Sequence, residues 1–193
     1  MAAGFFILLS LEKIRNMNIG VFCSANSAVS VSCYRAAEDL GRWIGANGHT
    51  LVWGGCSLGL MDTVGRSFLE TRTKGSLIGV VPSIIEERGK TFSAMDKTIS
   101  CNNLSERKDI IIENSDVLVA LPGGIGTLDE IFTVVSSATI GYHSKKMVLM
   151  NIGGFWNQLV SLLDHLEKEN MIRGNYRDRI IVCSAVEDLG KLV

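Results

Sequence analysis

Residues 117–139 read VLVALPGGIGTLDEIFTVVSSAT, and this stretch decides the fold. Val117 to Leu121 form a continuous apolar run, which is typical of a strand buried on both faces of a parallel sheet. A glycine-rich loop follows at Pro122 to Thr127, and apolar residues at helical spacing continue from Leu128 to Thr139. The stretch therefore predicts a strand, a tight loop and a helix, which is the repeating unit of an α/β fold.

The same order of strand and helix recurs on both sides of this stretch. Further apolar runs predict strands at residues 18–23, 50–53, 76–81, 147–151 and 180–183. Helical spacing predicts helices at residues 31–47, 58–71, 104–114, 156–169 and from Ala185 onward. Because short apolar strands alternate with helices throughout, we predict a Rossmann-like, doubly wound parallel sheet with helices on both faces.

One segment interrupts this regular pattern. Residues 83–100 follow Pro82 and are polar, charged and irregular in their spacing. Segments of this kind often carry function beside a rigid scaffold, so we expect a flexible loop next to a binding site here.

The composition excludes several classes of protein. The chain has 193 residues, 47% of them apolar and 20% charged, which excludes general disorder. Its 19 basic and 20 acidic residues give no broad positive surface, so we expect no nucleic-acid partner. The five scattered cysteines fit reduced thiols in a cytoplasm. The three isolated histidines give little support to a metal site, and none is expected.

The first sixteen residues stand apart from the repeating pattern. The apolar stretch from Phe5 to Leu11 is shorter than the ~20 residues that span a bilayer, and it lacks the flanking features of a secretory signal. We therefore expect no membrane contact. Residues 1–16 are predicted to be a poorly ordered extension, and residues 17–193 a single Rossmann-like domain.

Three loops are expected to meet at one edge of the sheet, because ligands of doubly wound folds bind beyond the carboxyl ends of the strands. They are residues 23–27, 54–61 and 122–127. The last two precede helices, whose N-termini offer backbone N–H groups to a phosphate. Glycines also make tight turns without any ligand, so Gly54 and Gly55 leave both interpretations open.

Two further positions carry charge near this edge. Glu130 follows Thr127 by one helical turn. It either stabilises the N-terminus of its helix or meets positive charge that develops on a sugar. Arg107 and Lys108 are either a solvated helix face or a group of anion ligands.

These residues resemble the LONELY GUY family of cytokinin riboside 5'-monophosphate phosphoribohydrolases, whose members were often mislabelled lysine decarboxylases. The resemblance rests on the glycine pattern of residues 54–61, on Gly79 to Pro82, on Arg107-Lys108 and above all on PGGxGTxxE at residues 122–130. It extends from about Asn18 to Val193. The chain departs from the family pattern at several positions, including Ile125, where tyrosine is usual, and residues 104–106, where Met-His-x is frequent.

The resemblance implies that Arg107 and Glu130 are the catalytic pair. The implied reaction splits a purine nucleoside 5'-monophosphate, AMP or an N6-modified AMP, into free base and ribose 5-phosphate. Cleavage of an N-glycosidic bond builds oxocarbenium-like charge, which a carboxylate such as Glu130 stabilises. Arginine keeps its proton at neutral pH, so Arg107 has an electrostatic and positioning role. The proton donor to the base is not assigned, and Asp129, Asp109 and water are candidates.

The expected substrate-binding residues lie in the three loops and beside Arg107. They are Ser24, Gly54, Gly55, Gly59, Met61, Lys108, Gly123, Gly124, Gly126 and Thr127. The resemblance implies no metal or organic cofactor, and it implies a homodimer with active sites near the subunit boundary. The apolar helix around Ile131, Phe132, Val134 and Val135 belongs either to that contact or to the core of one chain.

Two other functions remain to be compared with this one. A nucleotide-binding or carrier module of the same fold would use the glycine loops without turnover, and Glu130 would then only stabilise its helix. A decarboxylase would need pyridoxal phosphate on a lysine in an apolar setting, and no lysine of the sequence lies in such a context.

Overall fold

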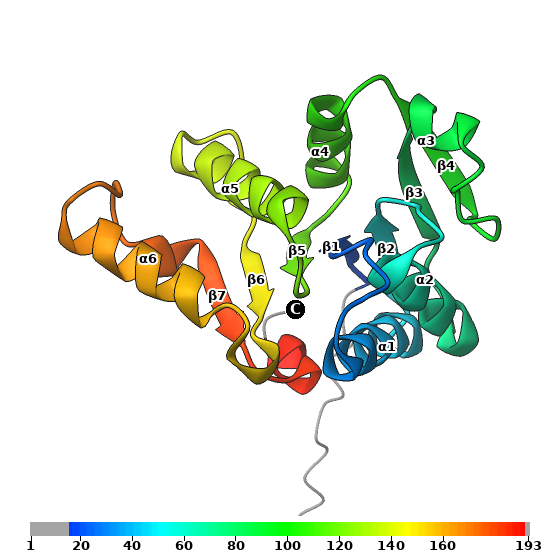
Figure 1. Ribbon diagram of the computed structural model, residues 1–193, viewed down its shortest axis with the longest axis horizontal. Coiled ribbons are helices and arrows are strands. Elements are labelled where there is room, and N and C mark those ends of the chain that lie inside the picture. The colour runs from blue at the N-terminus through cyan, green and yellow to red at the C-terminus, as the bar shows by residue number, and fades with distance from the viewer. Residues whose placement is uncertain (1–15, 192–193) are drawn as a thin grey trace, which may run out of the picture.

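The computed structural model describes residues 16–191, in which a seven-stranded parallel sheet runs through the molecule (Figure 1). The predicted extension therefore lies, except for Asn16, outside the described residues. The strand order is β4-β3-β2-β1-β5-β6-β7, and every neighbouring pair is parallel. The strands are β1 Asn18–Phe22, β2 Thr50–Trp53, β3 Leu77–Pro82, β4 Lys97–Cys101, β5 Val117–Ala120, β6 Met147–Met150 and β7 Ile180–Cys183.

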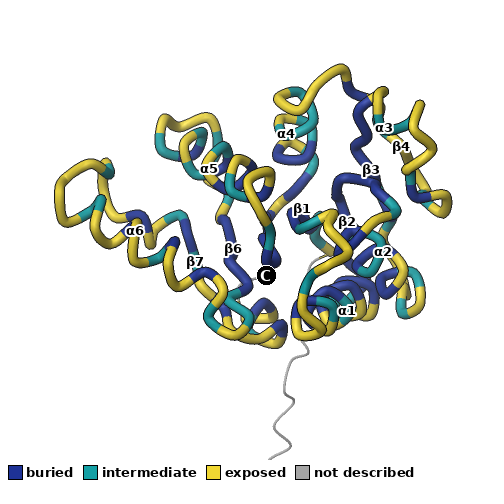
Figure 2. Tube along the Cα trace, in the orientation of Figure 1, coloured by how far each residue is buried: buried dark blue, intermediate teal, exposed yellow. Residues whose placement is uncertain are grey.

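Helices cover both faces of this sheet, which confirms the predicted doubly wound architecture. One face packs against α1 and α2 and the other against α4, α5 and α6, and each interface has its own apolar cluster. Figure 2 shows the buried strands between helices that are exposed on their outer sides. The helices are α1 Val31–Ala46, α2 Gly59–Thr71, α3 Ser83–Glu87, α4 Leu104–Glu113, α5 Ile125–Thr139 and α6 Asn157–Lys168, with 3-10 turns η1 Ile152–Gly154, η2 Tyr176–Asp178 and η3 Val186–Lys191.

The structure corrects the prediction for residues 83–100. This segment is not irregular throughout, because it contains α3 and most of the edge strand β4, which pairs with β3. Residues 88–96, between these two elements, belong to no helix or strand. Most residues of β4 are exposed, and only Cys101 is buried. An edge strand packs against few neighbours and therefore does not need the continuous apolar run by which a central strand is recognised.

Two helix predictions also need correction. The helix after the glycine loop begins at Ile125 instead of Leu128, so Gly126 and Thr127 belong to its first turn. The predicted helix at the C-terminal end is the 3-10 turn η3 within the described residues. Glycine has a low helix propensity, which hides a helix start that tertiary packing nevertheless favours.

The order of the strands places one crevice at the centre of the sheet. The chain leaves β1 for α1 on one face, and it leaves β5 for α5 on the other, so the loops after these two neighbouring strands diverge. Backbone hydrogen bonds tie the loops together there: Ser24 N donates to Pro122 O at 3.4 Å, and Leu60 N donates to Ser24 O at 3.0 Å. Such a switch point is where doubly wound folds bind ligands.

Three further features of residues 16–191 concern the cysteines, the helices and the potential metal ligands. All five cysteines are buried and unpaired, as expected for reduced thiols. Over the same range, no helix has the length and apolar character needed to cross a membrane. No group of three or more His, Cys, Asp or Glu side chains within these residues is arranged to bind a metal ion.

Candidate active site

A cavity of about 260 Å³ lies at the central crevice. Its walls come from the loop after β1, from α2, from α4 and from the start of α5. The lining residues are Cys23, Ser24, Ala25, Met61, Arg107, Gly124, Gly126, Thr127 and Glu130. The structure thus brings together both predicted catalytic residues and five of the predicted substrate-binding residues.

Glu130 is the buried acid of this cavity. Its side chain is 9% exposed, and burial raises its pKa from 4.5 to about 7, with Asp129 adding to the rise and Arg107 and Lys108 opposing it. Glu130 lies beyond the first turn of α5, whose N-cap residue is Gly124. It therefore does not act as a helix cap, and the second interpretation of this carboxylate, as a group facing a ligand, fits the structure.

Arg107 reaches the same cavity from α4. Its Nη1 lies 3.5 Å from Glu130 Oε1, and its Nε donates to Val80 O at 3.1 Å. The side chain is 12% exposed, so the guanidinium is largely shielded from water. The start of α4 is defined by Asn103, whose side-chain oxygen accepts a hydrogen bond from Glu106 N. Arg107 and Glu130 are thus a buried charged pair that faces an open space, and Arg107 is not on a solvated helix face.

The N-terminus of α5 forms one end of the cavity. A side-chain carbon added at Gly124 or Gly126 would meet no atom within 4 Å, so both positions face open space. Thr127, in the first turn of the same helix, is buried. A helix N-terminus provides free N–H groups and a positive partial charge, which suit a phosphate.

Four predicted glycines do not line the cavity. A side-chain carbon at Gly54 would overlap Arg107 Nη2, and one at Gly55 would meet Val81 and Met95. The corresponding carbon at Gly59 would contact the backbone of the loop after β1, and at Gly123 it would contact Thr127. These glycines make room for other parts of the chain, so the turn-and-packing interpretation applies to Gly54 and Gly55.

Lys108 does not line the cavity either. Its Nζ donates to both carboxylate oxygens of Asp129, at 2.7 and 2.8 Å. Asp129 and Asp109 also lie outside the cavity wall, which makes both poor candidates for the proton donor.

Cys23 and Ala25 also line the cavity, although neither was among the predicted substrate-binding residues of the loop at residues 23–27. Cys23 is buried at the end of β1, and this burial together with the nearby Glu130 carboxylate raises the pKa of its thiol far above the usual range. The thiol is therefore neutral at physiological pH, and its reactivity as a nucleophile is low. Its position directly after a buried strand was the signal that could have identified it.

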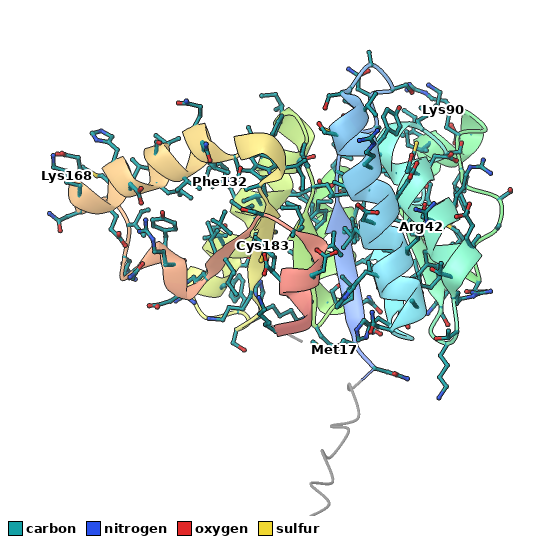
Figure 3. The ribbon with its side chains drawn as sticks, turned by 90° about the horizontal axis from the view of Figure 1, so that it is seen from below. Met17, Arg42, Lys90, Phe132, Lys168 and Cys183 are labelled. Atoms are coloured by element: carbon teal, nitrogen blue, oxygen red, sulfur yellow. The ribbon has the colours of Figure 1, made fainter. Side chains whose placement is uncertain are left out.

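A second, larger depression of about 600 Å³ runs between α5 and α6. Phe132 and Val135 line it, whereas Ile131 and Val134 of the same helix are buried in the core. Phe132 is 40% exposed and lies on the side of the molecule away from Arg42 of α1 (Figure 3). The apolar helix therefore serves the core with one face and leaves the other open.

Comparisons with known proteins show the family and the fold of this chain. Residues 61–193 match a family model described as "possible lysine decarboxylase". The cytokinin riboside 5'-monophosphate phosphoribohydrolase LOG4 of Arabidopsis thaliana is 32% identical over 94% of this chain and 84% of its own length. That of Rhodococcoides fascians is 32% identical over 88% and 85%. The molybdenum cofactor carrier protein of Chlamydomonas reinhardtii superimposes with a TM-score of 0.67 at 26% identity, covering 92% of this chain and 96% of its own.

Proposed function

This chain belongs to the family described as "possible lysine decarboxylase", together with the cytokinin riboside 5'-monophosphate phosphoribohydrolases, and we propose that it hydrolyses the N-glycosidic bond of a nucleoside 5'-monophosphate. This membership confirms the resemblance to the LONELY GUY family. The products would be a free base and ribose 5-phosphate. Within the family's substrate range we propose a purine nucleotide, AMP or an N6-modified AMP.

One observation carries this proposal: a buried carboxyl group and an arginine share a cavity with an open helix N-terminus. Glu130 and Arg107 approach to 3.5 Å, and Gly124 and Gly126 leave space beside them. A site that only bound anions would gain nothing from a buried carboxylate, because it repels a phosphate. A site that must stabilise both a phosphate and a cationic sugar needs both groups.

The proposed reaction follows from this geometry. The 5'-phosphate binds at the N-terminus of α5, which places the ribose toward Glu130. As the bond from C1' to the base breaks, the Glu130 carboxylate stabilises the positive charge on the sugar. Water adds its oxygen to C1' and gives one proton to the Glu130 carboxylate, and the departing base takes up one proton from solvent water. Because the pKa of Glu130 lies at about 7, its carboxylate can accept the proton of the attacking water at neutral pH.

Arg107 has a different task in the same step. Its guanidinium has a Val80 carbonyl on one side and Glu130 on the other, so its orientation is fixed before a substrate binds. A guanidinium keeps its charge and offers several donors in one plane, which suits phosphate and ribose oxygens. We therefore assign Arg107 to electrostatic stabilisation and positioning, not to proton transfer.

Lysine decarboxylation does not fit this cavity. Pyridoxal phosphate would need a lysine close to its carbonyl carbon. Among residues 16–191, no lysine lines the cavity, and the ammonium of nearby Lys108 is engaged by Asp129.

A carrier function is the second candidate, and the likeness to the molybdenum cofactor carrier protein favours it. Such a module would bind a phosphorylated ligand at α5 without turnover. The buried Glu130 argues against it. Burial of a carboxyl group costs free energy, and such costs are concentrated at sites where the group acts on a ligand.

We further propose that two copies of the chain associate through the depression between α5 and α6. Phe132, Ile140 and Met171 expose apolar surface along it, and Asp129 and Arg173 place opposite charges on its walls. A surface that offers both signs can pair with a second copy of itself. Asp129 adjoins Glu130 in the chain, so this contact would bring the subunit boundary close to the active site.

The decisive experiment is incubation with AMP and detection of adenine. We expect Glu130→Gln and Arg107→Ala each to lower kcat at least about 100-fold, because each removes charge stabilisation of the transition state. Arg42→Met is the matched control, since Arg42 of α1, labelled in Figure 3, forms exposed ion pairs and does not line the cavity. Parent-like rates in both site variants would refute the catalytic assignment. Tight AMP binding without adenine would establish the carrier function instead.

The base preference needs a comparison of substrates. Rates on AMP, GMP, CMP and isopentenyl-AMP, measured under the same conditions, test the proposed purine specificity. A faster rate on CMP than on AMP would contradict it.

A further inference from the structure

A second ion pair lies directly beside the catalytic pair and joins the same two helices. Lys108 follows Arg107 on α4, and Asp129 precedes Glu130 on α5. The contact between Lys108 Nζ and Asp129 is close and bidentate, at 2.7 and 2.8 Å, whereas Arg107 and Glu130 are 3.5 Å apart. The shorter ion pair, Lys108–Asp129, is thus adjacent in the chain to the longer pair, Arg107–Glu130.

The half of α4 that carries Arg107 has little apolar anchorage. The buried residues of α4 are Ile111 and Ile112, both in its C-terminal half, and Leu104 at its start is 62% exposed. The N-terminal half is held by polar contacts: the Asn103 cap, the bond from Arg107 Nε to Val80 O, and the Lys108 ion pair. Within residues 16–191, the hydrogen bonds and ion pairs that link this half to α5 are those of Arg107 and of Lys108.

We propose that Lys108 and Asp129 are a positioning pair that holds the start of α4 against α5 and thereby keeps Arg107 aligned with Glu130. This inference rests on the proposed function, because alignment matters only if the two residues act together on a substrate. It assigns Lys108 to positioning and not to substrate binding, since its side chain is only 13% exposed and its ammonium donates to both carboxylate oxygens of Asp129.

The pair also balances the charge that Glu130 experiences. The titratable and charged groups that face Glu130 are Arg107 and Lys108 from α4, Asp129 from α5 and Cys23 from the end of β1. Lys108 lowers the pKa of Glu130, and Asp129 raises it. Removal of Lys108 alone leaves the Asp129 carboxylate uncompensated beside Glu130 and raises the pKa of Glu130 further.

The test uses Lys108→Met, Asp129→Asn and the charge-exchanged double variant Lys108→Asp with Asp129→Lys. We expect each single variant to lower kcat on AMP about tenfold with less than about a twofold change in KM, because a small displacement of a catalytic group reduces turnover. The double variant restores kcat to within about threefold of the parent. Global stability changes little, since Asp129 is 52% exposed and such pairs contribute little to folding.

Glu70→Gln is the matched control, because Glu70 joins α2 to Arg42 of α1 through an ion pair remote from the cavity. It should leave kcat and KM unchanged. Parent-like kcat in both single variants overturns the proposal. A rise in KM for Lys108→Met, with Asp129→Asn silent, also overturns it and identifies Lys108 as a substrate ligand.

A second measurement separates this inference from the proposed function. NMR titration of the Glu130 carboxyl carbon in the substrate-free protein should give a higher pKa in Lys108→Met than in the parent. If the parent does not hydrolyse any nucleotide, the proposed function fails, and the titration alone then decides on the pair. An unchanged pKa in Lys108→Met overturns the pair whether or not the parent is active.

Discussion

The two glycine loops look alike in the sequence but have opposite uses in the structure. At Gly54 and Gly55, the space that a side chain would occupy is filled by Arg107, Val81 and Met95. At Gly124 and Gly126, the same space is open. The first loop is a filled loop, in which glycine admits another part of the protein. The second is an open loop, in which glycine leaves room for a ligand.

The difference matters because the proposed function assigns both loops to one reaction. The filled loop provides the recess in which the Arg107 guanidinium lies, so it positions a charged group. The open loop offers backbone N–H groups at the start of α5, where the proposed function places the 5'-phosphate. Replacement of a glycine in the filled loop should therefore lower kcat, and replacement of a glycine in the open loop should weaken substrate binding.

The largest effect is expected for Gly54→Ala. The new methyl group would overlap Arg107 Nη2, and the guanidinium must leave its recess. We expect kcat on AMP to fall about 100-fold, close to the effect of removing the charge itself. Circular dichroism should remain unchanged, because the atom displaced is the end of a flexible side chain.

Gly190→Ala is the control for Gly54→Ala. Gly190 is exposed in η3, and an added side-chain carbon there meets no atom within 4 Å. It should retain parent activity. Equal activity of Gly54→Ala and Gly190→Ala would show that the recess at Gly54 has no influence on Arg107.

The next effect concerns pH and the carboxyl group between the two loops. The pKa of Glu130 is raised from 4.5 to about 7 by burial, so the folded protein binds its proton more tightly than the unfolded chain does. The free energy of unfolding contributed by Glu130 is therefore greatest below about pH 4.5 and falls as the pH rises to about 7. Between about pH 5 and 7 the loss is on the order of 2 kcal/mol.

Urea unfolding at several pH values measures this loss. Glu130→Gln cannot ionise, so its unfolding free energy should lack this decrease. The two proteins should differ most near neutral pH, where the parent buries a charge. Parallel pH profiles for the parent and Glu130→Gln would show that Glu130 titrates as an ordinary exposed acid.

Gly124→Ala tests the open loop. An added methyl group meets no protein atom, so folding should be unaffected, but it occupies the space that a phosphate needs beside the N-terminus of α5. We expect KM for AMP to rise about tenfold, and kcat to change less, because the lost interaction is made equally in the ground and transition states. A tenfold loss of kcat at unchanged KM would reverse the roles assigned to the two loops.

The contrast between the loops also explains how far the sequence could predict the site. The central strands, such as Val117–Ala120, are buried on both faces and show it as apolar runs, whereas the edge strand Lys97–Cys101 is mostly exposed and was missed. Arg107 and Glu130 were identified through a motif. Glycine at position 54 indicates only that something approaches the backbone closely. Whether the approaching group is a ligand or the Arg107 guanidinium depends on how α4 packs against the sheet, and a local sequence pattern does not predict that packing.

The smallest effect is expected from truncating Met95, a side chain that packs against the filled loop. Met95 is half-buried, its sulfur packs against Gly79 and near Gly55, and it does not line the cavity. Met95→Ala should lower the free energy of unfolding by about 1–2 kcal/mol, less than truncation of a fully buried methionine, and leave kcat and KM within about twofold of the parent. Urea unfolding and AMP kinetics on one preparation measure both quantities. If KM rises while the free energy of unfolding is unchanged, Met95 contacts the substrate directly. The filled loop is then part of the binding surface and not only a recess for Arg107.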